Sequence, residues 1–447
     1  MQSLRYAIRN DLGKEDVQWC LTVPAIWDEK AKQLMRTYAE KAGMIQGPHC
    51  PAGVSASRRG LSIILEPEAA SVHCLESVYE SLNLTIGDKV IVADVGGGTI
   101  DLVVHEIVEF RPPMGVTRVK EAVPSFGSSG GGTFVDIAFL QWVQQKVGCY
   151  EDFIRQGNTE LSLRLFSWWQ RVKADFDRSP TYTAQFMLRH SGLSEAWKNY
   201  DRAHHIHKED KAYWVLTLNA DDLRQIFHSE VSKVISLIEP YINMAKVLMV
   251  VGGMAESQYV KHAIISKFKN SGRQIIIPHD PGRAVCRGAV KLHMSKDYIQ
   301  SRISKKTYGI CAIRDAQKGD PENLIFINDE GRRKCRSAFS AFVQVGERIC
   351  FGQETSRCFY SHTAAQLSLE FDVYSSPRRD PKYTIEADAT REGSFDIDIS
   401  CALHLGKRRE VKVTMVFGDS LINVIAVPTN FVAPDNRKEL TVRFEAS

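Results

Sequence analysis

Three consecutive glycines between two β-branched runs constrain this chain more than any other feature. Residues 90–104 read Val-Ile-Val-Ala-Asp-Val-Gly-Gly-Gly-Thr-Ile-Asp-Leu-Val-Val. The pattern predicts a strand, a tight turn and a returning strand. Glycines in such a turn can adopt positive φ and leave their backbone N–H groups open to a ligand. A phosphate group fits this arrangement, whereas an ordinary glycine-rich hairpin would explain the glycines alone.

Two acids flank the glycines and favour the phosphate interpretation. Asp94 lies at the end of the first strand, and Asp101 lies at the start of the second. Phosphoryl chemistry needs a metal charge and a positioned nucleophile, and a carboxylate at a strand end suits a hydrated Mg²⁺ or an attacking water. We therefore expect Asp94 to serve as a catalytic and metal-binding residue.

Length and charge limit the classes of protein to which this chain can belong. With 447 residues we expect two or three domains, and a net charge of +4 gives no reason to expect nucleic acid as a partner. No apolar run is long enough to predict membrane insertion. The ten cysteines lack metal-binding spacing, which favours reduced thiols and a cytoplasmic location.

The pattern of short apolar runs changes near residue 300. From 17 to 298, buried-type strands alternate with amphipathic helices, which predicts an α/β domain over 1–298. Beyond it, alternating segments separated by turn residues predict a β-sandwich over 299–447. The strands expected in this second domain are 368–374, 395–401, 410–416, 421–427 and 439–445.

A second glycine turn and two charged positions complete the candidate site. Gly252 and Gly253 end a buried-type strand, and such glycines admit a phosphate or a flat ring, although tight packing alone also explains them. Glu66 follows another strand, where a helix N-terminus or an interlobe cleft suits its charge. Lys173 lies on a predicted helix, where it could hold a phosphate or face solvent.

These turns together resemble the 70-kDa heat-shock protein family, which has the actin-like (ribonuclease H-like) ATPase fold. The resemblance rests on five segments in the family's order, and their residues are closer to its divergent heat shock 70 kDa protein 12 branch. It covers about 15–298 well, and the strands near 413–427 resemble the family's substrate-binding β-domain more weakly. The segments are Leu21-Thr22-Val23-Pro24-Ala25, Glu66-Pro67-Glu68-Ala69-Ala70, Asp94 to Asp101, Gly252-Gly253-Met254-Ala255-Glu256-Ser257, and Asp280 to Ala289.

The resemblance implies ATP or ADP with Mg²⁺ as cofactors and assigns roles to individual residues. Asp94 would position a Mg²⁺-bound water, and Glu66 would be the cleft carboxylate that links nucleotide state to the β-domain. Lys173 would lie beside the ring and ribose. The phosphates would be held by Gly96, Gly97, Gly98 and Thr99, and the adenosine pocket would be lined by Gly252, Gly253, Met254 and Glu256.

The chain departs from the family pattern in ways that bear on activity. The family's first phosphate hairpin and catalytic lysine have no counterpart, so we expect an ATPase domain truncated at its N-terminus, and no helical lid follows the β-domain. We accordingly expect an ATP-binding, chaperone-like protein that takes polypeptide clients through its β-domain, with little hydrolysis. The alternatives are a non-hydrolysing regulatory protein on the same fold and, with less support, a sugar-kinase relative.

Overall fold

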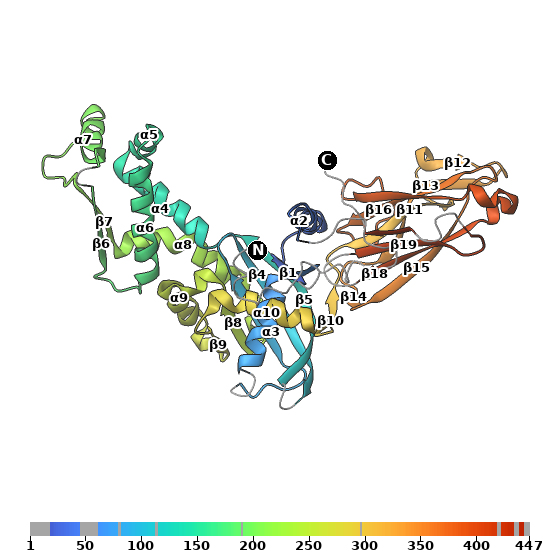
Figure 1. Ribbon diagram of the computed structural model, residues 1–447, viewed down its shortest axis with the longest axis horizontal. Helices are drawn as coiled ribbons and strands as arrows, with labels where there is room; N and C mark the ends of the chain where they lie inside the picture. Colours follow the sequence, from blue (N-terminus) through green and yellow to red (C-terminus); the bar gives the residue numbers. More distant parts are fainter. Residues whose placement is uncertain are drawn as a thin grey trace, which may run out of the picture.

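A seven-stranded sheet forms the centre of the first part of the molecule (Figure 1). The computed structural model describes residues 18–44, 61–78, 82–111, 115–188, 191–295, 297–417, 422–432 and 438–441. The sheet has the order β14-β10-β5-β4-β3-β8-β9 and mixes parallel with antiparallel pairs. Its strands are β3 (Lys89–Val95), β4 (Thr99–Arg111), β5 (Gly115–Ser129), β8 (Val247–Val251), β9 (Gln274–Ile276), β10 (Ile299–Ile303) and β14 (Arg348–Cys350).

Helices cover both faces of this sheet, and strand β3 shows why. Its side chains alternate, so that Ile91 and Ala93 enter one hydrophobic core while Val90 and Val92 enter the other. Because β3 is buried on both faces, its sequence is a continuous run of apolar residues and does not alternate between apolar and polar. In the described part of the chain, no helix is long and apolar enough to cross a membrane. The helices are α3 (Glu66–Val78), α4 (Gly132–Val147), α5 (Tyr150–Arg155), α6 (Thr159–Asp175), α7 (Leu193–Ala203), α8 (Ala220–Ile238), α9 (Gln258–Phe268) and α10 (Ala284–Met294).

Two small sheets extend the first part. Strands β1 (Trp19–Val23) and β2 (Leu61–Leu65) pair in parallel, and helix α2 (Glu29–Lys41) connects to β1 through a turn. The Asp28 side chain accepts a hydrogen bond from the Ala31 N–H and caps α2. Strands β6 (Thr183–Met187) and β7 (Val215–Asn219) pair on the side where α5 and α7 lie, at the end of the molecule away from the β-rich part (Figure 1).

The second part consists of two antiparallel sheets that share one hydrophobic core. Tyr308, Phe371 and Phe395 of the five-stranded sheet and Val413 and Met415 of the four-stranded sheet belong to this core. The five-stranded sheet contains β11 (Thr307–Asp315), β12 (Ile325–Ile327), β13 (Arg333–Val343), β16 (Ser368–Ser376) and β17 (Thr390–Asp398). The four-stranded sheet contains β15 (Gln353–Tyr360), β18 (Glu410–Phe417), β19 (Ile422–Pro428) and β20 (Lys438–Thr441).

Strand β10 joins the two parts. It pairs in parallel with β5 and antiparallel with β14, which follows β11 and β13 of the second part in the chain. The domain boundary that the sequence predicts between 298 and 299 therefore lies directly before a strand of the first sheet.

Several elements differ from the sequence-based expectation. Helix α7, whose Leu193 and Trp197 are buried one turn apart, has no counterpart in the elements expected from the sequence. The strand expected at 395–401 begins earlier, at Thr390. The strands between 307 and 360 were not predicted from their pattern, because strands such as β15 expose most of their side chains.

A close approach of two helices gives a test of the fold. A Cβ at Gly288 of α10 would lie 1.7 Å from the Ala69 carbonyl oxygen of α3. We expect Gly288→Ala to force these helices apart and to destabilise the first part by roughly 1–3 kcal/mol. A lowered midpoint in thermal unfolding is the expected result. Val290→Ala, at an exposed position of the same helix, is the matched control, and an equal loss in both variants would contradict the packing argument.

Candidate active site

The candidate site forms where β3 and β8 end and helices α3 and α4 begin. Asp94 pairs in register with Asp101 of β4 on one side and with Val251 of β8 on the other. Glu66 is the first residue of α3, directly after β2. The sheet topology therefore brings together carboxylates from three separate segments, as the sequence predicted for Asp94 and Glu66.

The glycine turn after β3 is fixed by a second glycine-rich segment. The Gly96 N–H donates to the Thr99 carbonyl oxygen at 3.0 Å and closes the turn. The carbonyl oxygens of Gly96, Gly97 and Gly98 accept hydrogen bonds from the N–H groups of residues 132, 133 and 130 at 3.0, 2.8 and 3.1 Å. These contacts leave the turn's own N–H groups, other than that of Gly96, available to a ligand.

The space around these glycines is open on one side. A Cβ at Gly98 or Gly253 would meet no atom within 4 Å, and one at Gly97 would meet only the Thr133 hydroxyl, at 3.6 Å. Open space over backbone N–H groups at the start of helix α4 suits an anion. The turn therefore has open space and free N–H groups of the kind that a phosphate requires, and we call it the phosphate cradle.

Gly252 is required by the geometry of Asp94. Its φ is +93°, and a Cβ at this position would lie 2.4 Å from Asp94 Oδ1. A side chain here would be strained and would displace the carboxylate. The two glycine turns thus form one site, because the second makes room for the acid that precedes the first.

The three carboxylates lie in an environment that disfavours their charged forms. Burial, with Glu66 and Asp101 nearby, raises the pKa of Asp94 to about 8. Burial and the charge of Asp101 raise the pKa of Glu66 to about 7. Burial also raises the pKa of Asp101, although the Thr99 hydroxyl and backbone N–H groups act against this shift.

Asp101 supplies an acceptor that the described residues leave unused. Its Oδ1 accepts a hydrogen bond from the Ile26 N–H at 3.1 Å, while its buried Oδ2 has no partner. In the described part of the chain, no Lys or Arg lies at ion-pair distance from Asp94, Glu66 or Asp101. Clustered carboxylates without a cation fit a hydrated Mg²⁺.

The remaining predicted residues occupy different surroundings. Lys173 reaches the glycine segment, where its Nζ donates to the Gly132 carbonyl oxygen at 2.7 Å and to Asp136 at 2.8 Å. Met254 is buried and belongs to the hydrophobic core. Glu256 is exposed, and a Cβ at Gly282 would lie 2.6 Å from its Oε1. Gly253 is exposed and faces open space.

Sequence reasoning missed one residue that supports the cradle. The buried Glu230 on α8 accepts a hydrogen bond from the Gly131 N–H at 2.7 Å and forms an ion pair with Lys233. Gly131 has a φ of +116° and lies against the carbonyl oxygen of Gly96. Because Glu230 is 99 residues away in sequence, no local pattern identifies it.

The raised pKa of Asp94 predicts how stability depends on pH. A carboxyl whose pKa is about 3.8 when unfolded and about 8 when folded opposes folding once it must ionise. In metal-free protein, stability therefore falls as pH rises from 4 to 8. We expect Asp94→Asn to raise the thermal midpoint at pH 8 and to flatten this dependence.

Thermal unfolding of the unaltered chain and of Asp94→Asn, measured at pH 5 and at pH 8 in EDTA, tests this prediction. Asp175→Asn, at an exposed position of α6, should keep the dependence of the unaltered chain. An unchanged slope in Asp94→Asn would show that this carboxyl does not titrate between these limits.

Comparison with known proteins finds relatives that match most of the chain. Human heat shock 70 kDa protein 12B is 26% identical, over 96% of this chain and 71% of that protein. Mouse heat shock 70 kDa protein 12A is also 26% identical, over 94% of this chain and 70% of its own length. The chaperone protein HscA homolog of Cupriavidus metallidurans is 24% identical, over 65% of this chain and 39% of that protein.

No protein-family model matches the chain. The similarity to the relatives nevertheless spans both parts of the molecule. It includes the segments that carry the carboxylates and both glycine turns. Over most of its length the chain is thus similar to the heat shock 70 kDa protein 12 branch of the 70-kDa heat-shock protein family.

Proposed function

We propose that this protein binds ATP or ADP with Mg²⁺ in the cleft formed by the two glycine turns. The observation that carries the proposal is the open phosphate cradle beside three carboxylates that form no ion pair in the described part of the chain. Mg²⁺ would supply charge to neutralise the phosphates. Glu66, Asp94 and Asp101 would hold it or its waters, and the N–H groups of Gly97 and Gly98 would bind phosphate oxygens.

The proposed protein is chaperone-like, with the β-rich part as the binding surface for polypeptides. Support comes from the relatives, whose similarity extends over 96% and 94% of the chain, and from a link between α3 and β10, the strand that joins the two parts. Glu68, two residues after Glu66 on α3, forms a two-fold hydrogen-bonded ion pair with Arg302 of β10 at 2.7 and 2.8 Å. Burial acts to raise the pKa of Glu68, but Arg302 holds it below its ordinary value.

A second candidate is a protein that binds nucleotide without turning it over. The lysines beside the cradle favour it, because Lys173 is paired with Asp136 and Lys233 with Glu230. Stabilising a transferring phosphoryl group requires cationic groups directed at it. Both lysines are instead committed to carboxylates, so the described residues support binding better than rapid hydrolysis.

Thermal stabilisation by nucleotide tests the proposed site. We expect millimolar Mg-ATP to raise the unfolding midpoint by several degrees, since ligand at about 100 times its Kd stabilises by about 2.7 kcal/mol. Gly97→Val should remove the shift, because the valine side chain would occupy the cradle. Asp94→Asn should remove only the part of the midpoint shift that depends on Mg²⁺.

Asp175→Asn is the control for these variants and should respond as the unaltered chain does. A midpoint that does not move with Mg-ATP, in a chain that unfolds cooperatively, would count against the nucleotide site itself.

Phosphate release separates the two candidates. For the non-hydrolysing protein, we expect steady-state release from ATP at the level of the Asp94→Asn variant, while fluorescent ATP still binds. Release at least tenfold above that level, lost in Asp94→Asn, would establish turnover and contradict the second candidate.

A further inference from the structure

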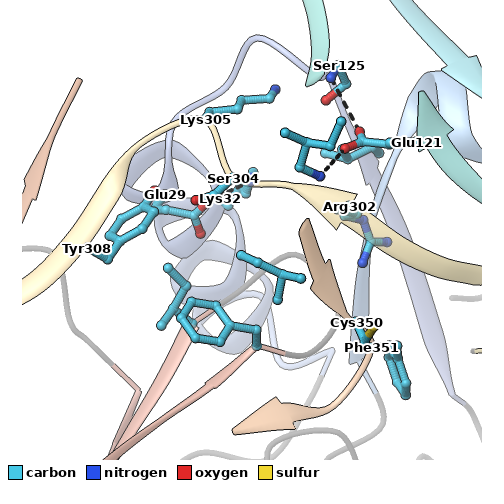
Figure 2. A pocket seen from close by; sticks show the side chains of 15 residues that line it. Glu29, Lys32, Glu121, Ser125, Arg302, Ser304, Lys305, Tyr308, Cys350 and Phe351 are labelled. Carbon is cyan, nitrogen blue, oxygen red and sulfur yellow. Dashed lines mark hydrogen bonds and ion pairs between the residues drawn. The ribbon is translucent and has the colours of Figure 1, made fainter. Parts of the chain in front are cut away.

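A buried carboxyl group holds the connecting segment, residues 299–305, against the first part of the molecule. Glu121 of β5 is 1% exposed, and its Oε2 accepts a hydrogen bond from the Ile303 N–H at 2.7 Å. Its Oε1 accepts a longer hydrogen bond from the Ser125 N–H, at 3.3 Å. Figure 2 shows the Glu121 carboxyl with these two hydrogen bonds. The attachment of the connecting segment thus depends in part on an ionisable side chain.

The burial of Glu121 depends on the strands that lead into the β-rich part. Strand β10 pairs with β5 so that Ser301 is opposite Lys120, and two residues further on the Ile303 N–H donates to the Glu121 side chain. From β14, the Arg348 guanidinium donates to the Glu121 main-chain oxygen at 2.9 Å and to the Ser301 hydroxyl at 3.0 Å. Displacement of β10 and β14 from the first sheet would therefore expose the Glu121 carboxyl to water.

Glu121 also lines a cavity of about 130 Å³ between the two parts, which we call the junction cavity. This cavity lies beside residues 302–305 and is bounded in the β-rich part by Phe351, Phe417 and Ile422 (Figure 2). A cavity of this volume has room for water. Water in it would give protons a route to the carboxyl while the two parts remain joined.

The groups around Glu121 make its negative charge unfavourable. Glu68 of α3 is fully buried, and its charge opposes ionisation of Glu121. The Ile303 N–H, Arg302 and Lys305 favour ionisation. However, Arg302 is already paired with Glu68 at 2.7 Å, and the Lys305 ammonium donates to a backbone carbonyl oxygen at 2.8 Å. Burial and the charge of Glu68 therefore raise the pKa of Glu121 from 4.5 to about 7.

Two neighbours of Glu121 keep their charge state between pH 6 and pH 8. His105 is opposite Glu121 on β4, and burial lowers the pKa of this histidine to about 4, so that it stays neutral. Burial acts to raise the pKa of Glu68, but Arg302 holds it below its ordinary value, so that Glu68 stays negative. Neither group can therefore account for a change of charge near neutral pH.

Helix α2 and the end of the connecting segment complete the surroundings of Glu121. Glu29 and Lys32 of α2 line the junction cavity and form an ion pair at 2.7 Å. Burial lowers the pKa of Lys305, which also lines the cavity. Lys305 is therefore a second group whose charge has to be tested together with that of Glu121.

We propose that the joining of the two parts depends on a proton carried by Glu121, so that they separate more readily at pH 8 than at pH 6. The protonated carboxyl keeps its carbonyl oxygen for the Ile303 N–H and adds no charge to the buried junction. When β10 and β14 move away, water surrounds the carboxyl, which ionises and releases its proton to solvent. Because separation releases a proton, a rise in pH favours it.

The sign and size of the effect follow from the pKa of Glu121 in the two forms. This pKa is about 7 in the joined form and returns to 4.5 when the carboxyl is exposed. Below pH 4.5 both forms bind the proton, and pH has no effect through this group. Between these values only the joined form keeps the proton, so it becomes less stable as pH rises. From pH 6 to pH 8 the ratio of joined to separated molecules falls about tenfold.

Hydrogen exchange of the connecting segment measures this ratio. The full chain, in EDTA and without nucleotide, is labelled at pH 6 and at pH 8 for times scaled to the intrinsic exchange rate, and its peptides are analysed by mass spectrometry. We expect the protection of residues 299–304 to be about tenfold lower at pH 8. Equal protection at the two pH values, or higher protection at pH 8, would overturn the proposal.

The Glu121→Gln variant distinguishes this carboxyl from other sources of pH dependence. Its amide oxygen can accept the Ile303 hydrogen bond, and the side chain is uncharged at both pH values. We expect the difference in protection between pH 6 and pH 8 to fall to less than about twofold. Glu354→Gln, at an exposed position of β15, should keep the dependence of the unaltered chain. A tenfold difference that persists in Glu121→Gln would contradict the proposal.

The Lys305→Gln variant tests the same carboxyl in a chain that retains it. Without the lysine charge, ionisation of Glu121 becomes less favourable. The fall in protection should therefore persist and move to higher pH. Loss of the pH dependence in Lys305→Gln would identify the lysine as the titrating group and would overturn the assignment to Glu121.

The carboxylate cluster, formed by Glu66, Asp94 and Asp101, serves as an internal reference. The pKa of Asp94 is also raised by burial, to about 8, so exchange in residues 94–101 reports a separate pH dependence. This dependence should be the same in Glu121→Gln and in the unaltered chain. Its loss together with that of the connecting segment would show that the substitution acts through the cluster, contrary to the proposal.

Discussion

The pairing of β3 with its two neighbours is the constraint on which the rest of the site depends. The pairing of β3 with β4 places Asp94 opposite Asp101. The pairing of β3 with β8 brings Gly252 against the Asp94 carboxylate. A shift by one residue would turn Asp94 to the opposite face of the sheet. The alternation of Val90 to Val95 between two apolar cores opposes any such shift. Hydrophobic packing thus fixes the position of groups that are themselves unfavourable to bury.

Helix α3 connects the carboxylate cluster to strand β10. Its first turn presents Glu66 to the carboxylate cluster and Glu68 to Arg302. The buried His105, whose pKa burial lowers to about 4, lies on the same side and contacts Ser71 at 2.8 Å. Since buried ion pairs are costly to separate, the Glu68–Arg302 pair holds α3 against β10.

Much of this description follows from local sequence, and the remainder depends on tertiary contacts. Asp94, the glycine triplet and Glu66 are identified by the residues next to them, because strand ends and turns have local signatures. Helix α7 escapes detection because its apolar face is only Leu193 and Trp197 within a polar segment. Asp101 was noted as a flanking acid, but its unpartnered oxygen appears only when β3 and β4 pair.

Other features cannot be predicted from any local sequence pattern. Glu230 supports the glycine segment from a distant helix, and the walls of the junction cavity come from segments between Glu29 and Ile422. Met254 shows the converse, since a position adjacent to a site glycine proves to be a core residue. Adjacency in sequence predicts proximity but not the direction of a side chain.

Strand β14 covers the edge of the seven-stranded sheet at which the two parts join. By pairing with β10 it occupies what would otherwise be an open edge of the seven-stranded sheet. Unpaired strand edges recruit other chains, and β10 joins the parts at that edge. Separation of the two parts would uncover the backbone groups of β10, which the three-residue strand β14 now pairs.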